Sequence, residues 1–337
     1  GVVVVTGDDR VEFVDNAVSN HVPETDGRGC YALLLDPQGG IETDMYVYNA
    51  GERLLLFTPP QRAEPLADDW AEKVFIQDVE IDDVSDEFGV FGVHGPKSTE
   101  KVASVLGGPG APEGPLSFVR GSMVDAGVTV IATDAPLGEE GYEIVCAAAD
   151  AGDVFDTLIN RGLNAAPFGY RTWDALATEA GTPLFEYELA GTVPNVLGLR
   201  NALDFEKGCY VGQEVVSRVE NQGRPSRRLV GLELDGVAEA VDGVDPNADP
   251  QGIDAALPAS GAAVFDGDEA IGEVTRAAVG PATDVPVALA LVGFDAALGE
   301  VAVRVDGEES PATAVDLPFV DGSARSARLP TYPEGRA

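Results

Sequence analysis

Residues 205–214 read Phe205-Glu206-Lys207-Gly208-Cys209-Tyr210-Val211-Gly212-Gln213-Glu214. Two glycines, Gly208 and Gly212, flank a cysteine and a tyrosine, and glycines at such positions are typical of a tight turn or of a close approach of the backbone. Lys207 lies two residues before Cys209, and a neighbouring positive charge favours a reactive thiolate. A single cysteine is also often a small buried apolar residue. The spacing alone therefore leaves both interpretations of Cys209 open.

This segment lies in a positively charged stretch of a strongly acidic chain. Residues 200–228 contain six basic and four acidic residues, whereas the 337 residues together contain 21 basic and 58 acidic residues, for a formal net charge of −37. Because arginine side chains bind carboxylates and phosphates, the stretch predicts contact with an anionic ligand. The alternative is that its basic residues pair with the surplus of carboxylates between domains.

The composition of the whole chain excludes several classes of protein. The apolar content of 45% predicts a folded chain rather than a disordered one. The negative charge argues against a nucleic-acid binder and against an anionic membrane surface. No stretch approaches the roughly 18 apolar residues of a membrane helix, and the first residues do not resemble a signal peptide. A folded chain with so many acidic residues and only four lysines indicates adaptation to high salt, so we expect a halophile and a cytoplasmic location.

The cysteines and histidines limit the chemistry that the chain can perform. Its three cysteines are Cys30, Cys146 and Cys209, which form no CxxC pair, and its histidines are His21 and His94. This set predicts neither a zinc site nor a disulfide framework, and it leaves little room for a Ser-His-Asp triad. Any chemistry is therefore expected from carboxylates, tyrosine, arginine, a cysteine or a bound cofactor, with no directly bound metal.

The pattern of apolar residues and turns predicts an α+β fold followed by a small β domain. The expected strands are residues 31–35, 45–48, 53–57, 75–84, 88–93, 128–133 and 142–148. The expected helices are residues 60–73, 97–106, 152–161 and 169–180. After about residue 228, short strands alternate with Gly/Asp/Pro turns, which predicts a barrel. Residues 242–257 read as an acidic loop, and the tail after about residue 322 is expected to be mobile.

The segment Lys207–Glu214 resembles the K-G-C-Y-x-G-Q-E signature of the YgfZ-type folate-binding proteins. These proteins are tied to iron–sulfur cluster maintenance and are relatives of the glycine-cleavage T-protein, the aminomethyltransferase. Five further segments resemble T-protein motifs: Gly39-Gly40-Ile41 with Asp44 (G-G-I-x-D-D), Gly95–Ser98 (G-P-K-A), Gly138–Ile144 (T-G-E-D-G-Y-E-I), Asp174, Leu176 and Glu179–Gly181 (R-D-x-L-R-x-E-A-G), and Ile271–Thr275 (I-G-x-V-T-S). Together they cover nearly the whole chain.

The resemblance implies a ring of three domains around a central channel that holds tetrahydrofolate or a one-carbon derivative of it. In this arrangement residues 1–50 and 120–227 form a discontinuous folate-binding α+β region. Residues 51–119 form a ferredoxin-like α+β domain, residues 228–322 a C-terminal β-barrel, and residues 323–337 a tail.

The resemblance also implies roles for individual residues. Asp44 would lie near folate N5 and N10, where a carboxylate stabilises positive charge or moves a proton; the alternative is an exposed turn residue. Glu179 would accept hydrogen bonds from the pterin edge, unless it is a solvated helix carboxylate. The other expected folate contacts are Tyr142, Glu143, Lys207 and Arg227. For Tyr142 and Glu143 the alternative is a role in strand packing. Arg228 could take the place of Arg227, and for both the alternative is an interdomain salt bridge. Cys209 would be a partly exposed thiol that faces the channel or a partner protein.

Three departures from the T-protein motifs bear on the function. Thr43 stands where the first acid of the D-D pair is expected, Trp173 stands in place of the arginine of the R-D pair, and Asn195 or Val196 stands where a glutamate is usual. They favour a YgfZ-like folate-binding protein that supports iron–sulfur client proteins. Because Asp44 is retained, an aminomethyltransferase that works with a lipoylated carrier protein is the alternative. A non-catalytic folate-binding scaffold is a third interpretation.

Overall fold

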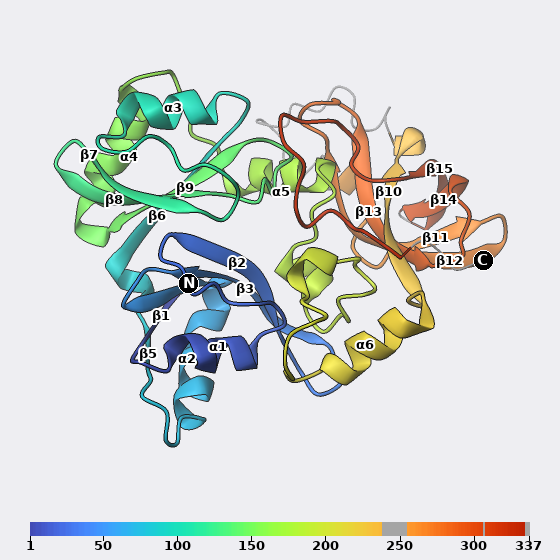
Figure 1. The fold of residues 1–337 in the computed structure, drawn as a ribbon. Helices are drawn as coiled ribbons and strands as arrows, with labels where there is room; N and C mark the ends of the chain where they lie inside the picture. Colours follow the sequence, from blue (N-terminus) through green and yellow to red (C-terminus); the bar gives the residue numbers. More distant parts are fainter. Residues whose placement is uncertain (238–254, 306, 334–337) are drawn as a thin grey trace. The chain divides into compact units, whose positions relative to one another are not determined.

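The computed structural model describes residues 1–237, 255–305 and 307–333 (Figure 1). These residues form two compact units, each of which is assembled from separate segments of the chain. Unit 1 consists of Gly1–Ala135, Glu139–Pro167 and Asn201–Val215. Unit 2 consists of Pro136–Gly138, Phe168–Arg200 and the described part of Val216–Ala337. The fold is therefore mixed α and β, as the sequence predicts, and it ends in a closed six-stranded barrel.

The first sheet of unit 1 is antiparallel and has the strand order β2-β3-β4-β1-β5. Its strands are β1 (Val2–Thr6), β2 (Arg28–Leu35), β3 (Ile41–Asn49), β4 (Arg53–Phe57) and β5 (Glu80–Asp83). The predicted meander of three strands is confirmed as β2, β3 and β4, which pair in sequence order. The predicted strand over 75–84 is shorter than expected, because β5 pairs only with β1 and the register ends at Thr6 opposite Glu80.

The two faces of this sheet bury different partners, since alternate residues of a strand point to opposite sides. Val3 and Val5 pack in one core with α1 (Arg10–Ala17) and α2 (Ala63–Glu72), which lie on the same side of the sheet (Figure 1). Val4 packs in a second core with residues of the other sheet of unit 1. This face of the first sheet is therefore the one that packs against the second sheet.

The second sheet of unit 1 has the strand order β6-β9-β8-β7. Its strands are β6 (Phe88–His94), β7 (Phe118–Met123), β8 (Ala126–Ala132) and β9 (Gly141–Ala147), and α3 (Ser98–Val105) and α4 (Ala151–Asn160) pack against it. The predicted pairing of the strands near residues 130 and 145 is confirmed as β8 with β9.

Unit 2 contains the barrel, whose closed strand order is β10-β13-β12-β11-β14-β15. Its strands are β10 (Arg227–Glu233), β11 (Ala263–Asp266), β12 (Glu269–Val279), β13 (Pro286–Gly293), β14 (Gly299–Val305) and β15 (Glu308–Val315). The helices of this part are α5 (Tyr170–Glu179), which contacts β12, and α6 (Gln213–Gln222), which begins in unit 1. Short helical turns cover Pro60–Arg62, Ser85–Glu87, Ala148–Asp150, Phe185–Leu189, Arg200–Ala202 and Asp235–Val237. The barrel prediction is confirmed.

Two other expectations meet the structure differently. The predicted domain boundary after residue 50 falls between β3 and β4, which are hydrogen-bonded neighbours in one sheet. The predicted mobile tail is packed over residues 323–333: Ser326, Arg328 and Leu329 are buried, and the Tyr332 hydroxyl donates to the Val196 carbonyl. Most of the predicted acidic loop at 242–257 lies outside the described residues. The ring around a channel stays a prediction.

No helix among the described residues is both long and apolar enough to cross a membrane.

Candidate functional site

A cluster of carboxylates and tyrosines lies in unit 1, on the side of the first sheet that faces the second sheet. Asp44 in β3 is 7% exposed, and the Tyr31 hydroxyl in β2 donates a hydrogen bond to its Oδ2 at 3.0 Å. The register places Tyr31 opposite Tyr46 and Leu33 opposite Asp44, so the two side chains meet diagonally across the strand pair. The alternative that Asp44 is an exposed turn residue is therefore wrong.

The cluster continues through Tyr46 to a second carboxylate. The Tyr46 ring lies 5.0 Å from the Tyr31 ring and stacks at 6.4 Å on Tyr48, measured between centroids. Its hydroxyl donates to Oδ1 of Asp134 at 2.7 Å, and Asp134 is 2% exposed. Tyr31 and Asp134 were not identified as site residues from the sequence. The alternation of Tyr46 and Tyr48 along one strand predicts channel-facing positions for them, with a place in the core as the alternative.

His94 ends β6 close to Asp134. Burial lowers the pKa of His94 to about 4, and the Asp134 carboxylate acts in the opposite direction. The imidazole is therefore neutral at pH 7. Glycines leave room for it, because a Cβ at Gly141 would lie 2.4 Å from Nδ1 and one at Gly92 would lie 2.6 Å from Nε2. Two carboxylates, tyrosine hydroxyls and a neutral imidazole can accept N–H donors and hold a proton in a site of low dielectric.

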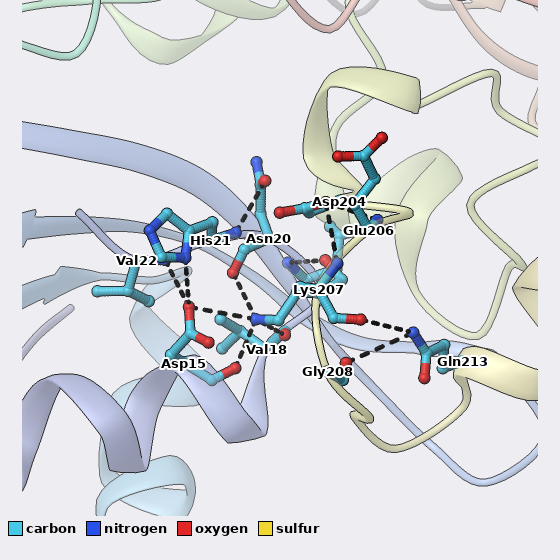
Figure 2. Close-up of polar contacts among 12 residues, drawn as sticks. Asp15, Val18, Asn20, His21, Val22, Asp204, Glu206, Lys207, Gly208 and Gln213 are labelled. Atoms are coloured by element: carbon cyan, nitrogen blue, oxygen red, sulfur yellow. Dashed lines mark hydrogen bonds and ion pairs between the residues drawn. The ribbon is translucent and has the colours of Figure 1, made fainter.

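The Lys207 side chain attaches the segment Lys207–Glu214, which we call the cysteine loop, to the end of α1. It is 4% exposed, and its Nζ donates to the carbonyls of Asp15 (2.5 Å), Val18 (3.0 Å) and Asn20 (2.8 Å), as Figure 2 shows. Asp15 adds an ion pair at 3.4 Å. Helix ends leave carbonyls without intrahelical partners, and a cation there is favourable. Three acceptors use all three N–H bonds of the ammonium group, so none remains for a ligand in this arrangement.

Gly212 brings the same loop against the turn between β2 and β3. Its φ is +81°, and a Cβ there would lie 2.7 Å from the Asp36 carbonyl oxygen and 2.9 Å from Leu35 Cβ. On the facing side, a Cβ at Gly39 would lie 2.9 Å from Val215 Cβ. The predicted close approach of the backbone is thus confirmed at Gly212. The loop packs against the turn that joins the two strands of Tyr31 and Asp44.

Cys209 is exposed and carries a free thiol. Cys30 and Cys146 are buried, and burial raises the pKa of the Cys30 thiol to about 12. The neighbouring Tyr210 is 7% exposed, with its ring 5.9 Å from Lys207 Nζ. The interpretation of Cys209 as a buried apolar residue is therefore wrong. The thiol lies on the surface of a loop that is fixed on either side of it, at Lys207 and at Gly212.

Tyr142 and Glu143 are neighbours in β9 of unit 1. Tyr142 packs in the core of the second sheet, and its hydroxyl lies 2.9 Å from Thr99 Oγ1. Glu143 is partly buried and pairs across the ladder with Gly92 and Ile131. Tyr142 thus has the packing role that was its alternative, while a folate contact of either residue stays a prediction.

Glu179 and Arg227 belong to unit 2. Glu179 ends α5, is 1% exposed, and accepts hydrogen bonds from the backbone N–H groups of Ala282 and Thr283 and from the Thr283 hydroxyl, at 2.8–3.2 Å. It is therefore no solvated helix carboxylate, and pairing with a pterin would require these bonds to open. Arg227 forms an ion pair with Glu273 at 2.5 Å, which lies within the barrel rather than between domains.

Unit 2 also holds a buried ion pair that the sequence did not indicate. Glu188 is 1% exposed, and its carboxylate lies 3.5 Å from the Arg276 guanidinium. The Thr275 hydroxyl and the Leu184 N–H each donate a hydrogen bond to the same carboxylate, both at 2.8 Å. Burial raises the pKa of Glu188, while Arg276 acts in the opposite direction. This cluster joins the 184–188 turn to β12 and has the character of a structural link.

Comparisons with known proteins agree over most of the chain. Residues 1–207 match the GCVT N-terminal domain, and residues 244–321 match the glycine cleavage T-protein C-terminal barrel domain. An aminomethyltransferase of Geobacillus kaustophilus is 30% identical over 328 residues, which cover 95% of this chain and 84% of that protein. One of Bacillus subtilis is 29% identical over 315 residues, 91% of this chain and 81% of that protein.

The fold has a counterpart among solved structures. The crystal structure of the glycine cleavage system aminomethyltransferase T from Bartonella henselae superposes with a TM-score of 0.76 at 22% identity, covering 99% of this chain and 85% of that one. With both domain models and the relatives in agreement, this chain belongs to the glycine-cleavage T-protein family.

Proposed function

We propose that this protein binds tetrahydrofolate in unit 1 and supports iron–sulfur cluster proteins through folate-dependent one-carbon chemistry. The observation that carries the proposal is the buried Asp44 carboxylate, held by the Tyr31 hydroxyl on a tyrosine-lined face of the sheet. Burying a carboxylate is costly, and a carboxylate that is buried beside specific polar partners is a candidate for binding or catalysis.

The residue types around Asp44 fit a folate. Carboxylates accept the N–H groups of such a ligand, and the rings of Tyr31, Tyr46 and Tyr48 offer flat apolar surface for its aromatic parts. Bound tetrahydrofolate supplies the nitrogens N5 and N10, which carry one-carbon units. Asp44 would stabilise positive charge there, or accept a proton at Oδ1 or Oδ2. The Tyr31 hydroxyl would keep the carboxylate in one orientation.

The cysteine loop favours the iron–sulfur branch over a simple transferase. Lys207 and Gly212 fix the loop, and Cys209 nevertheless presents its thiol to the surface. A transferase whose sulfur nucleophile arrives on a lipoyl arm has no evident use for such a thiol. An exposed cysteine on a fixed loop is suited to contact with a client protein.

An aminomethyltransferase of glycine cleavage is the second candidate. It is favoured by the relatives of that name, at 30% identity over 95% of this chain. In this reaction the aminomethyl group on the lipoyl sulfur of a carrier protein would give its methylene unit to the folate nitrogens, with release of ammonia and of the free lipoyl thiol. Asp44 would then be indispensable and Cys209 dispensable.

The deciding experiment treats Asp44 and Cys209 separately. Calorimetry at molar salt first measures tetrahydrofolate binding by the wild type, by Cys209→Ser and by Asp44→Asn. In a strain that lacks the native gene, Cys209→Ser should bind folate yet fail to restore iron–sulfur enzyme activity, whereas Asp44→Asn should restore it at least partly. Cys146→Ser, a change at a buried cysteine, is the matched control and should restore activity.

Two results would reverse the proposal. Glycine cleavage in vitro with lipoylated carrier, lost in Asp44→Asn and kept in Cys209→Ser, would establish the aminomethyltransferase instead. If the folded wild-type protein did not bind folate, both candidate functions would be excluded.

A further inference from the structure

An apolar groove of about 520 Å³ lies in unit 1, on the helical side of the first sheet and thus on the face opposite Asp44. Its apolar walls come from four parts of the chain: Phe13 of α1, Leu34 of β2, Trp70 of α2 with Ile76 beyond it, and Val211 of the cysteine loop. The folate site proposed above uses none of these residues.

The apolar surface at one end of the groove is unusually exposed. Phe75 is 85% exposed and Ile76 is 94% exposed, and Val211 at another wall is 49% exposed. Burying a large apolar side chain is favourable, so leaving two adjacent ones in water forgoes a substantial gain in stability. In a chain with 58 acidic residues, such a patch beside a groove is typical of a surface that another protein covers.

The polar residues of the groove make it acidic. Asp9 and Glu12 are among the residues that line it. Lys73 also lines the groove, and it forms an ion pair at 2.5 Å with Asp69, which lies one turn earlier on α2. The Phe13 and Trp70 rings meet edge to face at 5.7 Å, and aromatic faces also attract cations. A lining that is mostly apolar and carries acidic residues fits a segment that is both apolar and basic.

We propose that this groove docks a segment of a partner protein that presents a bulky apolar side chain flanked by lysine or arginine. Charge complementarity favours this occupant over a second copy of the same chain, because a copy would bring a further net charge of −37. Val211 is two residues beyond Cys209, about 7 Å of extended chain. A docked segment is therefore brought close to the exposed thiol, and the docking itself does not depend on folate.

Trp70 provides a direct probe of the groove. The chain has two tryptophans, so Trp173→Phe leaves Trp70 as the sole reporter. The full chain with this substitution is titrated with a 14-residue peptide of leucine and lysine, and with the same peptide carrying glutamate for lysine. The salt is the lowest KCl concentration at which circular dichroism is unchanged. We expect saturable changes in Trp70 emission with the lysine peptide and none with the glutamate peptide.

Matched variants show whether the groove itself binds the peptide. Ile76→Asp and Val211→Asp should each weaken binding by about tenfold or more, since each removes apolar burial. Val124→Asp is the control, because Val124 is 48% exposed in the turn between β7 and β8, away from the groove. It should leave the affinity unchanged.

Three results would overturn the proposal. Equal affinity of all variants would mean non-specific attraction to an acidic surface. If the glutamate peptide bound as tightly as the lysine peptide, the docked segment would not need to be basic. Self-association of the wild type in sedimentation experiments, abolished by Ile76→Asp, would make a second copy the occupant.

Discussion

The two units bury carboxylates in different ways. In unit 1 the Asp44 carboxylate accepts a hydrogen bond from the neutral hydroxyl of Tyr31, and Asp134 accepts one from Tyr46. In unit 2 the Glu188 carboxylate lies against the guanidinium of Arg276. A buried ion pair balances its charge inside the fold and mainly fixes the packing around it. The hydrogen bond from Tyr31 instead holds the Asp44 carboxylate in one orientation, on the face of the sheet where we propose that the ligand binds.

The largest effect on stability is expected in unit 2, from Arg276→Met. This change leaves Glu188 buried without its cation, and removing one partner of such a pair costs about 3–5 kcal/mol of unfolding free energy. Because the pKa of Glu188 is already raised by burial, the loss should be smallest at low pH and grow as the pH rises through that pKa. Denaturant unfolding at several pH values measures it.

A double variant tests the cause of this loss. Glu188→Gln with Arg276→Met should recover part of the lost stability, because no charge is then left buried. A single variant as stable as the wild type at pH 7 would show that the ion pair is not coupled to folding.

The second prediction concerns His94 in unit 1, where stability is lost as the pH falls and not as it rises. Burial lowers the pKa of His94 from its ordinary value of 6.5 to about 4 in the fold. The neutral ring therefore contributes stability above about pH 6.5, and this contribution is lost as the pH falls toward 4. At 1.36 kcal/mol per pKa unit it reaches at most about 3 kcal/mol.

His94→Gln should flatten the loss of unfolding free energy between pH 6.5 and 4. His21→Gln is the matched control, because His21 is exposed with 62% of its side chain accessible. Identical pH profiles of the wild type and His94→Gln would rule out a buried neutral imidazole.

The sequence predicted the parts of this fold that depend on local pattern. The meander of β2 to β4 follows from short apolar runs separated by turns, and the close approach at Gly212 follows from the absence of a side chain. Contacts between distant segments carry no such pattern. The family signature suggested Lys207 as a folate ligand, but its acceptors Asp15, Val18 and Asn20 lie 187 to 192 residues earlier in the chain.

Glu179 and Asp134 illustrate the same limit. Glu179 was matched to a family motif on one helix, while its partners Ala282 and Thr283 lie more than 100 residues later. Asp134 carries no local sequence signal, because its partner, Tyr46, lies 88 residues away. Family motifs identify residues, but only the packing of strands and turns decides what each side chain contacts.

Lys207 tests how firmly the cysteine loop is attached to unit 1. Lys207→Met keeps the length of the side chain but leaves three carbonyls without their donor, so we expect a loss of roughly 2 kcal/mol. Lys97→Met, at an exposed lysine, is the control and should be neutral. Hydrogen exchange should speed up in the loop around Cys209 only in the first variant. Unchanged exchange there would mean that Gly212 alone fixes the loop.

Glu179→Gln is expected to have a smaller effect, in unit 2. The amide would turn a donor toward N–H groups that now bond to the carboxylate, which costs about 1–2 kcal/mol. Glu300→Gln, at an exposed position of β14, should change nothing. If the folded variant binds tetrahydrofolate like the wild type, Glu179 serves α5 and the 282–283 turn. If the variant instead bound tetrahydrofolate tenfold more weakly, Glu179 would be a residue that contacts the pterin edge.

The smallest effect on stability is expected for Asp44→Asn, and it completes the comparison between the units. Asparagine keeps an oxygen that can accept the Tyr31 hydrogen bond and removes a buried charge, so the unfolding free energy should change by less than about 1 kcal/mol. The same change should slow any one-carbon transfer by about 100- to 1,000-fold, since the charge at the reacting nitrogens is lost. Tyr31→Phe, which removes only the hydroxyl that orients Asp44, should have an intermediate effect on rate. Denaturant unfolding measured beside a transfer assay separates the two quantities. If Asp44→Asn instead destabilised the fold as strongly as Arg276→Met, Asp44 would be a structural carboxylate like Glu188, and the distinction between the two units would fail.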